Sequence, residues 1–411
     1  MNSSLKIGLV TYRGNPHCGG QGVYIRHLSH ELTELGHDVE VISGLPLPVL
    51  NKNVKLTILK NLDLYNPDDL FRTPRFDELK DPVNLIEWLD VCTMGFPEPL
   101  TFGMRLKKYL KKIKTKYDII HDNQSLSYPI LSLAKSMPVV STIHHPMTID
   151  RRFAIKNADS FLKKIQALRW YSFISMQKRV ARKLSFIITV SFSSKRDIAK
   201  EYSILDSKFR IVPNGIDFNS FFPIENIKKE PGRIIVTNSA DTALKGLSYL
   251  IAAVKQVLEK RKVKLVIIGS LKENSNIKTL IKKLSLDNYI EFTGRIDQNR
   301  FAKEYAKASI AVIPSLYEGF GLPVGEAMAC KTPVICTTAG ALPEVAADAA
   351  KLVPPGDKDA LAKTILNLLD NPVLCKELVQ KGYKRVKKEF TWKKTALKTL
   401  EVYKEAIDAY N

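Results

Sequence analysis

Two glutamates, Glu318 and Glu326, with seven residues between them, form the densest chemical signal in this chain. The residues that follow the first glutamate are Gly319, Phe320, Gly321 and Leu322. The glycines permit positive φ and close backbone approach, and Pro323 is typical of the first turn of a helix. Helix N-termini bind phosphate, and carboxylates accept hydrogen bonds from hydroxyls. The pattern therefore predicts a site for a phosphate flanked by hydroxyl-bearing groups, as in a sugar nucleotide.

The segment before these glutamates predicts what positions them. Ser309 to Ser315 is a short apolar run, typical of a buried strand in a parallel sheet. The loop with Glu318 then leaves the carboxyl end of that strand, and ligands of open parallel sheets bind at this edge. We expect one carboxylate before the following helix and the other inside it.

The composition limits the class of protein. A chain of 411 residues with 45% apolar residues predicts two globular domains. No apolar run reaches the roughly 18 residues of a membrane span, and the N-terminus lacks the pattern of a signal peptide, so we expect a cytoplasmic protein. The five cysteines and seven histidines lack metal-ligand spacing, so we expect no metal.

The periodicity predicts an α/β fold with two alternating series of strands and helices. Strands are expected at Leu5 to Tyr12, Asp118 to His121, Val139 to Ile143, Phe186 to Val190, Arg233 to Thr237, Lys264 to Ser270 and Ile290 to Gly294, with a helix at Leu247 to Leu258. Pro213, Asn214 and Gly215 mark a hinge between the two series. We expect domains at residues 1–215 and 216–390 and a terminal helix at residues 391–411.

Three further motifs follow expected strands. The loop Gly19-Gly20-Gln21-Gly22 can approach a pyrophosphate or a sugar, and a tight structural turn is its alternative. Lys245-Gly246 opens a helix, where an ammonium suits a diphosphate but an ordinary solvated lysine is also common. His144 ends an apolar strand at the edge expected to bind the ligand, and a structural, hydrogen-bonded histidine is the other interpretation.

Charge is concentrated between Thr101 and Lys183, where 18 Lys and Arg face 4 Asp in a chain of net charge +21. Phe161 to Leu184 combines an apolar stripe with basic residues, and Arg105 to Lys116 is also basic. Residues 101–183 therefore predict contact with an anionic membrane surface, peripheral at its inner face. A core-packed helix with a solvated face is the alternative. Nucleic-acid binding has no supporting motif, and we expect none.

An Asp-x-Asp pattern, Asp357-Lys358-Asp359, is found in some metal-dependent sugar transferases. Here it stands directly before an amphipathic helix. Helix capping and the macrodipole explain an aspartate at that place, so we interpret the pattern as a cap instead of a metal site.

The motifs GGQGVY, STIHH, VPNGID, LKGL and EGFGLPVGEA, in this order, resemble a retaining glycosyltransferase of family 4 (glycosyl transferases group 1). The resemblance covers nearly the whole chain. It implies the GT-B fold, in which two Rossmann-like parallel-sheet domains face a central cleft and the terminal helix crosses back to the first domain. It also implies an enzyme that moves a hexose from a nucleoside-diphosphate sugar to a hydroxyl acceptor, such as a lipid-linked or cell-envelope glycan precursor.

The resemblance implies a role for each candidate residue. Glu318 would hydrogen-bond the donor sugar, Glu326 the ribose, and Lys245 the diphosphate. His144 would lie near the transferred sugar, and Gly20 and Gly22 near the phosphates. The donor-binding loop would comprise Gly319, Phe320, Gly321 and Leu322. Catalysis would be electrostatic, with no cofactor, no metal and no enzymic nucleophile.

One position departs from the family pattern. The family has an arginine six residues before the lysine, and this chain has Ser239 there. Arg295, Arg151 or Arg152 would supply the charge, or the diphosphate would bind more weakly.

The sequence allows two alternative functions to be considered. A catalytically idle GT-B protein would only bind a nucleotide or assist assembly. A nicotinamide-dependent oxidoreductase is disfavoured, because the glycine pattern is not GxGxxG and Glu40 lies inside the second strand. The sequence fixes neither the base, the sugar nor the acceptor.

Overall fold

The structure is a computed structural model that describes residues 4–15, 20–66, 68–113, 116–237, 243–271 and 275–411, without the side chains of residues 298 and 299. Its contacts divide the chain into two compact units. Unit 1 comprises Met1–Val190, Ser194–Val212 and Thr395–Asn411. Unit 2 comprises Ser191–Ser193 and Pro213–Lys394.

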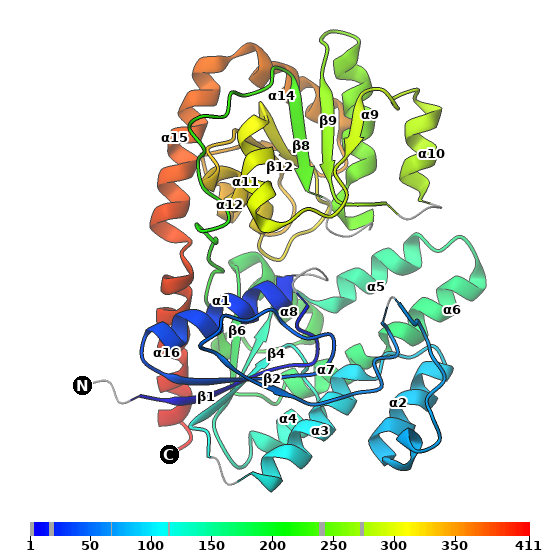
Figure 1. Cartoon of the computed structure of the whole chain (residues 1–411), viewed down its shortest axis with the longest axis vertical. Coiled ribbons are helices and arrows are strands. Elements are labelled where there is room, and N and C mark those ends of the chain that lie inside the picture. Colours follow the sequence, from blue (N-terminus) through cyan, green and yellow to red (C-terminus); the bar gives the residue numbers. More distant parts are fainter. Residues whose placement is uncertain (1–3, 16–19, 67, 114–115, 238–242, 272–274) are drawn as a thin grey trace. The chain divides into compact units, whose positions relative to one another are not determined.

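Unit 1 is built on a seven-stranded parallel sheet of order β3-β2-β1-β4-β5-β6-β7 (Figure 1). The strands are β1 Lys6–Thr11, β2 Asp38–Ser43, β3 Lys55–Ile58, β4 Ile119–Asn123, β5 Val139–Ile143, β6 Phe186–Thr189 and β7 Phe209–Ile211. The central strands are almost fully buried and rich in Val and Ile, as expected for a sheet covered on both faces.

The helices of unit 1 alternate with these strands. They are α1 Gly20–Glu34, α2 Pro82–Cys92, α3 Glu98–Lys112, α4 Tyr128–Leu133, α5 Met147–Lys156, α6 Phe161–Trp170, α7 Ile174–Ala181 and α8 Phe192–Tyr202. The last helix of the chain, α16 Trp392–Asp408, lies in unit 1 from Thr395 onward.

Unit 2 is built on a six-stranded parallel sheet of order β10-β9-β8-β11-β12-β13. The strands are β8 Arg233–Thr237, β9 Lys264–Ile268, β10 Ile290–Phe292, β11 Ile310–Ile313, β12 Val334–Thr337 and β13 Lys351–Val353. The helices are α9 Leu247–Leu258, α10 Asn276–Lys283, α11 Gln298–Lys307, α12 Leu322–Ala329, α13 Leu342–Ala346, α14 Lys358–Asp370 and α15 Pro372–Glu389.

Both sheets have the strand order of a doubly wound Rossmann-like domain, which confirms the α/β prediction and the two series of elements. The predicted bounds of β5, β8 and α9 match the structure, and the other predicted strands differ at their ends by one or two residues. The helix α9 illustrates why the periodicity was informative. Its buried residues Leu247, Leu250, Ile251, Val254 and Val257 recur at helical spacing and pack on the sheet of unit 2.

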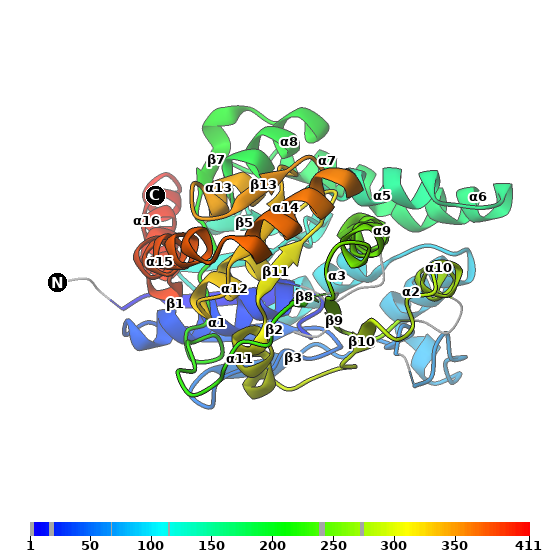
Figure 2. The same cartoon turned by 90° about the horizontal axis from the view of Figure 1, so that it is seen from above.

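The single amphipathic stripe expected over Phe161 to Leu184 is wrong. The segment breaks into α6 and α7, joined by a 3-10 turn at Tyr171–Phe173. The apolar residues of α7 are buried in the core of unit 1, whereas α6 has no buried residue. Both views show α5 and α6 extending away from the sheet of unit 1, with α6 outermost (Figures 1 and 2). Only α7, the second half of the segment, packs against the core of unit 1, so only its apolar residues are removed from water.

Candidate functional site

The motifs of unit 2 that contain Lys245 and Glu318 meet at the point where the strand order of its sheet reverses. Strands β8 and β11 are neighbours, although β9 and β10 lie between them in sequence. Lys245 follows β8, and the loop with Glu318 follows β11. Because both loops leave the carboxyl edge of the sheet at this switch point, the topology brings together two motifs that are 73 residues apart.

Glu318 and Lys245 form a direct ion pair. The Lys245 Nζ lies 2.8 Å from Glu318 Oε1, and Ser315 Oγ donates to the same oxygen over 2.8 Å. The two charged side chains are only 25% and 13% exposed. An ammonium has three donors and a carboxylate two acceptor oxygens, so the pair presents both kinds of group at one place.

The loop that contains Glu318 is held by close contacts between backbone segments. Ala341 N–H donates to the Glu318 carbonyl over 2.9 Å, and a Cβ on Gly340 (φ 56°) would lie 2.2 Å from that oxygen. Gly246 (φ 65°) approaches the Pro314 carbonyl so closely that a Cβ would lie 1.9 Å from it. Only glycine fits these two positions, which hold the Lys245 and Glu318 loops against the sheet.

Glu326 lies in the second turn of α12 and is half-buried. Burial raises its pKa to about 8; the positive charge of Lys245 opposes this rise, and the negative charges of Asp217 and Glu318 add to it. The carboxyl group is therefore mostly protonated at neutral pH. The sequence predicted a carboxylate here and gave no sign of this shift, because burial is a property of the folded chain.

The start of α12 offers fewer amides to an anion than the sequence indicated. Gly321 caps the helix in the left-handed region (φ 102°), Pro323 has no N–H, and Val324 N–H donates to the Gly321 carbonyl over 3.0 Å. Phe320 is buried, and its ring meets Phe390 edge-on, with 5.6 Å between ring centroids.

His144 belongs to the corresponding edge of unit 1, where it follows β5. Its Nε2 lies 2.8 Å from Asn123 Oδ1, and Asn123 Nδ2 donates to the Gln21 carbonyl over 3.4 Å. Burial, together with the neighbouring imidazoles of His145 and His121, lowers the pKa of His144 to about 3. The imidazole is therefore neutral. The sequence did not predict Asn123 as a site residue. Asn123 ends β4 and His144 follows β5, so both lie at the carboxyl ends of neighbouring strands, and this position could have identified Asn123 from the sequence.

A buried hydrogen-bonded chain lies behind His144. The Tyr24 ring meets the His144 ring edge-on, with 4.9 Å between centroids, and Tyr24 Oη lies 3.1 Å from Thr142 Oγ1. His121 is 2.6 Å from Thr142 Oγ1 through Nε2 and 2.6 Å from Tyr403 Oη through Nδ1. Residues of α1, β4, β5 and α16 are thus linked by polar contacts. No local pattern in the sequence connects them.

The glycine loop of unit 1 differs from its prediction. The helix α1 begins at Gly20, so Gly20 and Gly22 lie in its first turn instead of a preceding loop. A Cβ on Gly20 would meet nothing within 4 Å, so no steric contact requires glycine there. Gly19 lies outside the described residues.

The arginine that would replace the family's phosphate clamp is still a prediction. Ser239 lies outside the described residues. Arg295 is exposed in the segment after β10. Arg152, in α5, pairs with Glu201 over 2.8 Å and is 61% exposed, and Arg151 lies beside it in the same helix.

Asp357 is a helix cap, as predicted. Its carboxylate accepts hydrogen bonds from the N–H groups of Asp359 (3.0 Å) and Ala360 (2.8 Å) at the start of α14. In the part of the chain that the structure describes, no group of three or more His, Cys, Asp or Glu side chains is arranged to hold a metal ion. Among the same residues, no helix combines the length and apolar character needed to cross a bilayer.

The chain matches the models of two protein families. Residues 18–220 match the model for Glycosyltransferase Family 4, and residues 217–385 match the model for Glycosyl transferases group 1. The chain is 42% identical over 408 residues, 98% of both chains, to the MMP alpha-(1->4)-mannosyltransferase of Mycolicibacterium hassiacum.

Solved structures share the fold at lower identity. Sucrose-phosphate synthase from Thermosynechococcus elongatus matches with a TM-score of 0.76 and 24% identity, over 98% of this chain and 99% of that one. Anabaena Alr3699/HepE, solved in complex with UDP and glucose, matches with a TM-score of 0.69 and 16% identity, over 97% of this chain and 98% of that one. With two Rossmann-like sheets and a close relative that spans its length, the chain belongs to the family 4 glycosyltransferases of GT-B fold.

Proposed function

We propose that this glycosyltransferase moves a mannosyl residue from a nucleoside-diphosphate sugar to a hydroxyl of a glycan acceptor and forms an α-(1→4) bond with retention of configuration. The mannosyl group and the linkage come from the name of the relative that is 42% identical over 98% of the chain. Nucleoside-diphosphate mannose is itself an α-glycosyl phosphate, so an α-linked product corresponds to retention.

The observation that carries the proposal is the meeting of Lys245, Glu318 and Glu326 at the switch point of unit 2. The three side chains interact electrostatically, and the first two are paired over 2.8 Å. A nucleoside-diphosphate sugar has hydroxyls at both ends and negative charge between them. Carboxyl groups beside a lysine match this pattern, with Glu318 at the transferred sugar, Lys245 at the diphosphate and Glu326 at the ribose.

The chemical step needs charge stabilisation more than a nucleophile. The acceptor oxygen forms a bond to C1 of the sugar while the bond from C1 to the phosphate oxygen breaks. The acceptor's proton passes to the leaving phosphate oxygen, on the face from which the acceptor attacks. Lys245 stabilises the charge that develops on the diphosphate, and a preorganised cation of this kind is worth about 10²-fold or more in rate. We propose that no metal is required, and a transfer rate unchanged by EDTA would agree.

His144 is proposed to hold a hydroxyl of the transferred sugar. Its pKa of about 3 keeps the ring neutral, so it acts as a hydrogen-bond partner and not as a cation. The contact with Asn123 occupies Nε2 and leaves Nδ1 as the nitrogen for a second partner.

A thermal-shift screen followed by a transfer assay tests the proposal. We expect one base among GDP-, UDP- and ADP-sugars to stabilise the protein, by about 2.7 kcal/mol at a concentration of 100 Kd. With the matching mannose donor and a mannose-containing oligosaccharide acceptor, NMR of the product should show a new α-anomeric proton and a substituted C4.

The outcomes separate the alternatives. A β-linked product would contradict retention, and transfer of glucose in preference to mannose would contradict the donor assignment. Donor binding with neither transfer nor hydrolysis would favour the catalytically idle protein. A Glu318→Gln variant is the control, since it keeps the shape of the side chain and should lose transfer.

We also propose that unit 1 contacts an anionic membrane surface, now through α6 instead of the whole range 101–183. Phe161 and Leu162 are each 76% exposed and Leu168 is 52% exposed. Basic residues accompany them at Lys163, Lys164 and Arg169. Lys163 pairs with Asp159 over 2.8 Å and Arg169 pairs with Asp90, which leaves the exposed apolar residues as the main feature of α6. In α3, Arg105 pairs with Glu87 over 2.6 Å and Leu106 is buried, so that helix contributes to the core.

Flotation with vesicles tests the membrane contact. We expect the protein to float with phosphatidylglycerol vesicles and not with phosphatidylcholine, because apolar insertion and basic charge act together. Phe161→Ser with Leu162→Ser should abolish flotation. Leu205→Ser, at a residue of unit 1 that is 70% exposed, is the matched control and should float like the wild type. Equal recovery with both lipids, or in neither, would contradict the proposal.

A further inference from the structure

Unit 2 has a hollow at the edge of its sheet opposite the Lys245 and Glu318 loops. The lining includes residues next to the starts of β8, β11 and β12, namely Gly232, Ser309 and Pro333, together with the end of α14 and the start of α15. Its volume is about 470 Å³, within the range of small-molecule sites. Neither the family resemblance nor the proposed transfer uses this place.

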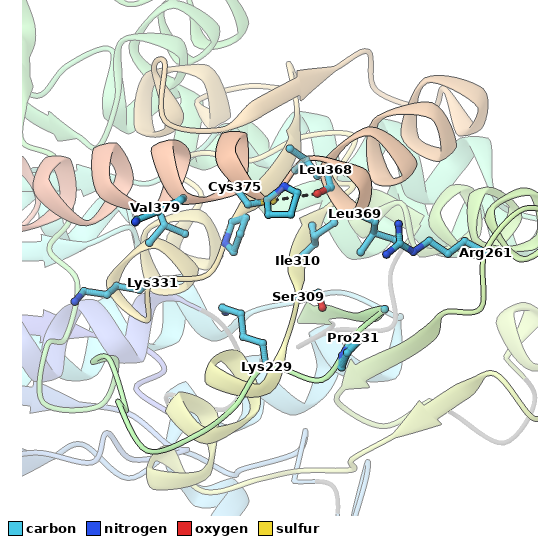
Figure 3. A pocket seen from close by; sticks show the side chains of 14 residues that line it. Lys229, Pro231, Arg261, Ser309, Ile310, Lys331, Leu368, Leu369, Cys375 and Val379 are labelled. Carbon is cyan, nitrogen blue, oxygen red and sulfur yellow. Dashed lines mark hydrogen bonds between the residues drawn. The ribbon is translucent and has the colours of Figure 1, made fainter.

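The floor of the hollow is apolar and its rim is basic. Ile310 and Leu368 are buried beneath it, and Leu369 and Val379 are half-buried apolar residues of the lining. The cations of the lining are Lys229, Arg261, Lys331 and Lys376, and no Asp or Glu belongs to the lining. Figure 3 shows Lys229 reaching into the opening, with Arg261 and Lys331 on opposite sides of it.

Part of this positive charge already has partners. Lys229 Nζ donates to the Ala308 carbonyl over 2.8 Å, Arg261 contacts Asp370, and Lys331 lies 5.0 Å from the centre of the Tyr383 ring. Arg261 and Lys331 also follow the C-terminal ends of α9 and α12, where helix dipoles attract cations. Charge alone would therefore bind an anion weakly here.

The ammonium of Lys229 is partly desolvated, which favours the binding of an anion beside it. Although the residue as a whole is exposed, its ammonium end lies in the pocket, and the partial loss of water lowers its pKa. An anion placed near this ammonium would restore the lost stabilisation of its charge. The apolar residues of the lining would strengthen the binding of a ligand with a hydrocarbon chain, because the chain would be removed from water.

We propose that this hollow is a second ligand site, which binds an amphipathic anion with its apolar body against the half-buried Leu369 and Val379 and its phosphate or carboxylate between Lys229 and Lys376. The site lies in unit 2 and does not depend on the transfer reaction proposed above. The amphipathic anion and the nucleotide donor should therefore bind at the same time, and neither should lower the affinity of the other.

Isothermal titration with four probes tests the ligand class. Octyl phosphate and octanoate carry both features, inorganic phosphate carries only the charge, and octyl glucoside carries only the chain. We expect one or both of the first two to bind at least about tenfold more tightly than the last two, and their ratio identifies the preferred headgroup. Equal binding of octyl glucoside, or no binding of either amphipathic anion, overturns the proposal.

Variants and a chemical probe then locate the site. Lys229→Met with Lys376→Met should weaken binding about tenfold, and Lys363→Met, an exposed lysine of α14 outside the lining, should leave it unchanged. Cys375 belongs to the lining and is half-buried, whereas Cys92 is exposed in unit 1.

Alkylation of the unmodified protein gives a readout that needs no variant. The bound probe should slow the reaction of Cys375 with N-ethylmaleimide and leave that of Cys92 unchanged, as resolved by peptide mass spectrometry. Unaltered Cys375 reactivity at saturating probe, or competition between the probe and the nucleotide donor, overturns the assignment to this hollow.

Discussion

The proposed contact between Glu326 and the ribose predicts that donor binding depends on pH. Burial, with the negative charges of Asp217 and Glu318, holds its pKa at about 8 despite Lys245. An ionised carboxylate accepts hydrogen bonds from ribose hydroxyls more strongly than a neutral one, so the binding form is the minor form at neutral pH. We therefore expect donor affinity to rise as the pH increases toward 8 and then to level off.

The size of the effect follows from the pKa. With a pKa of about 8, roughly one molecule in ten has the ionised carboxylate at pH 7 and roughly one in a hundred at pH 6. The Kd for the donor should thus fall about tenfold from pH 6 to pH 7, equivalent to about 1.4 kcal/mol. Between pH 7 and pH 9 it should fall by about another tenfold. The diphosphate diester of the donor has no titration in this interval.

Isothermal titration of wild type and Glu326→Gln from pH 6 to pH 9 measures this dependence. The variant keeps the shape of the side chain but replaces one acceptor oxygen with an NH2 donor and has no proton to lose, so its Kd should not change with pH. Wild-type binding at pH 7 should also release nearly one proton, detected by comparing buffers of different ionisation enthalpy. A flat wild-type profile, a Kd that rises with pH, or the same slope in the variant would refute the reasoning.

The remaining predictions concern catalysis, packing and stability. Lys245→Met should lower the single-turnover transfer rate about 10²-fold, because it removes the cation that we propose stabilises the leaving diphosphate. Tyr403→Phe should cost about 1–3 kcal/mol in urea unfolding, since it takes the partner from the buried Nδ1 of His121. Gly340→Ala should cost about 1–3 kcal/mol and weaken donor binding, because its Cβ would press on the Glu318 carbonyl at a positive φ. Glu326→Gln should gain melting temperature over wild type as the pH rises from 4.5 to 8, where the folded wild type keeps a proton that the unfolded chain releases.

Matched variants control these measurements. Lys363→Met should keep the transfer rate, since this exposed lysine lies on α14 away from β8 and β11. Tyr410→Phe removes the hydroxyl of a tyrosine that is 45% exposed and should leave stability unchanged. Gly20→Ala places its Cβ in open space and should be tolerated, in contrast to Gly340→Ala. Losses of equal size in a variant and its control would contradict the assigned contacts.

The local patterns of the sequence were sufficient for the fold and for part of the site. Apolar runs and helical spacing predicted α9, β5 and β8 at their observed bounds, because these signals depend on neighbouring residues. The position of His144 after a strand, and of Glu318 before a helix, followed in the same way. The prediction of one continuous amphipathic stripe over Phe161 to Leu184 was wrong, since a stripe of apolar residues does not show which half of it the core will cover.

What the sequence alone determined is the alternation of strands and helices, the glycine turns and the types of side chain at the strand ends, all properties of short segments. The tertiary structure decided which of these segments meet. Strand order placed β8 beside β11 and so put Lys245 against Glu318, 73 residues away. Burial, which exists only once the sheets and helices pack, kept Glu326 protonated and His144 neutral at pH 7.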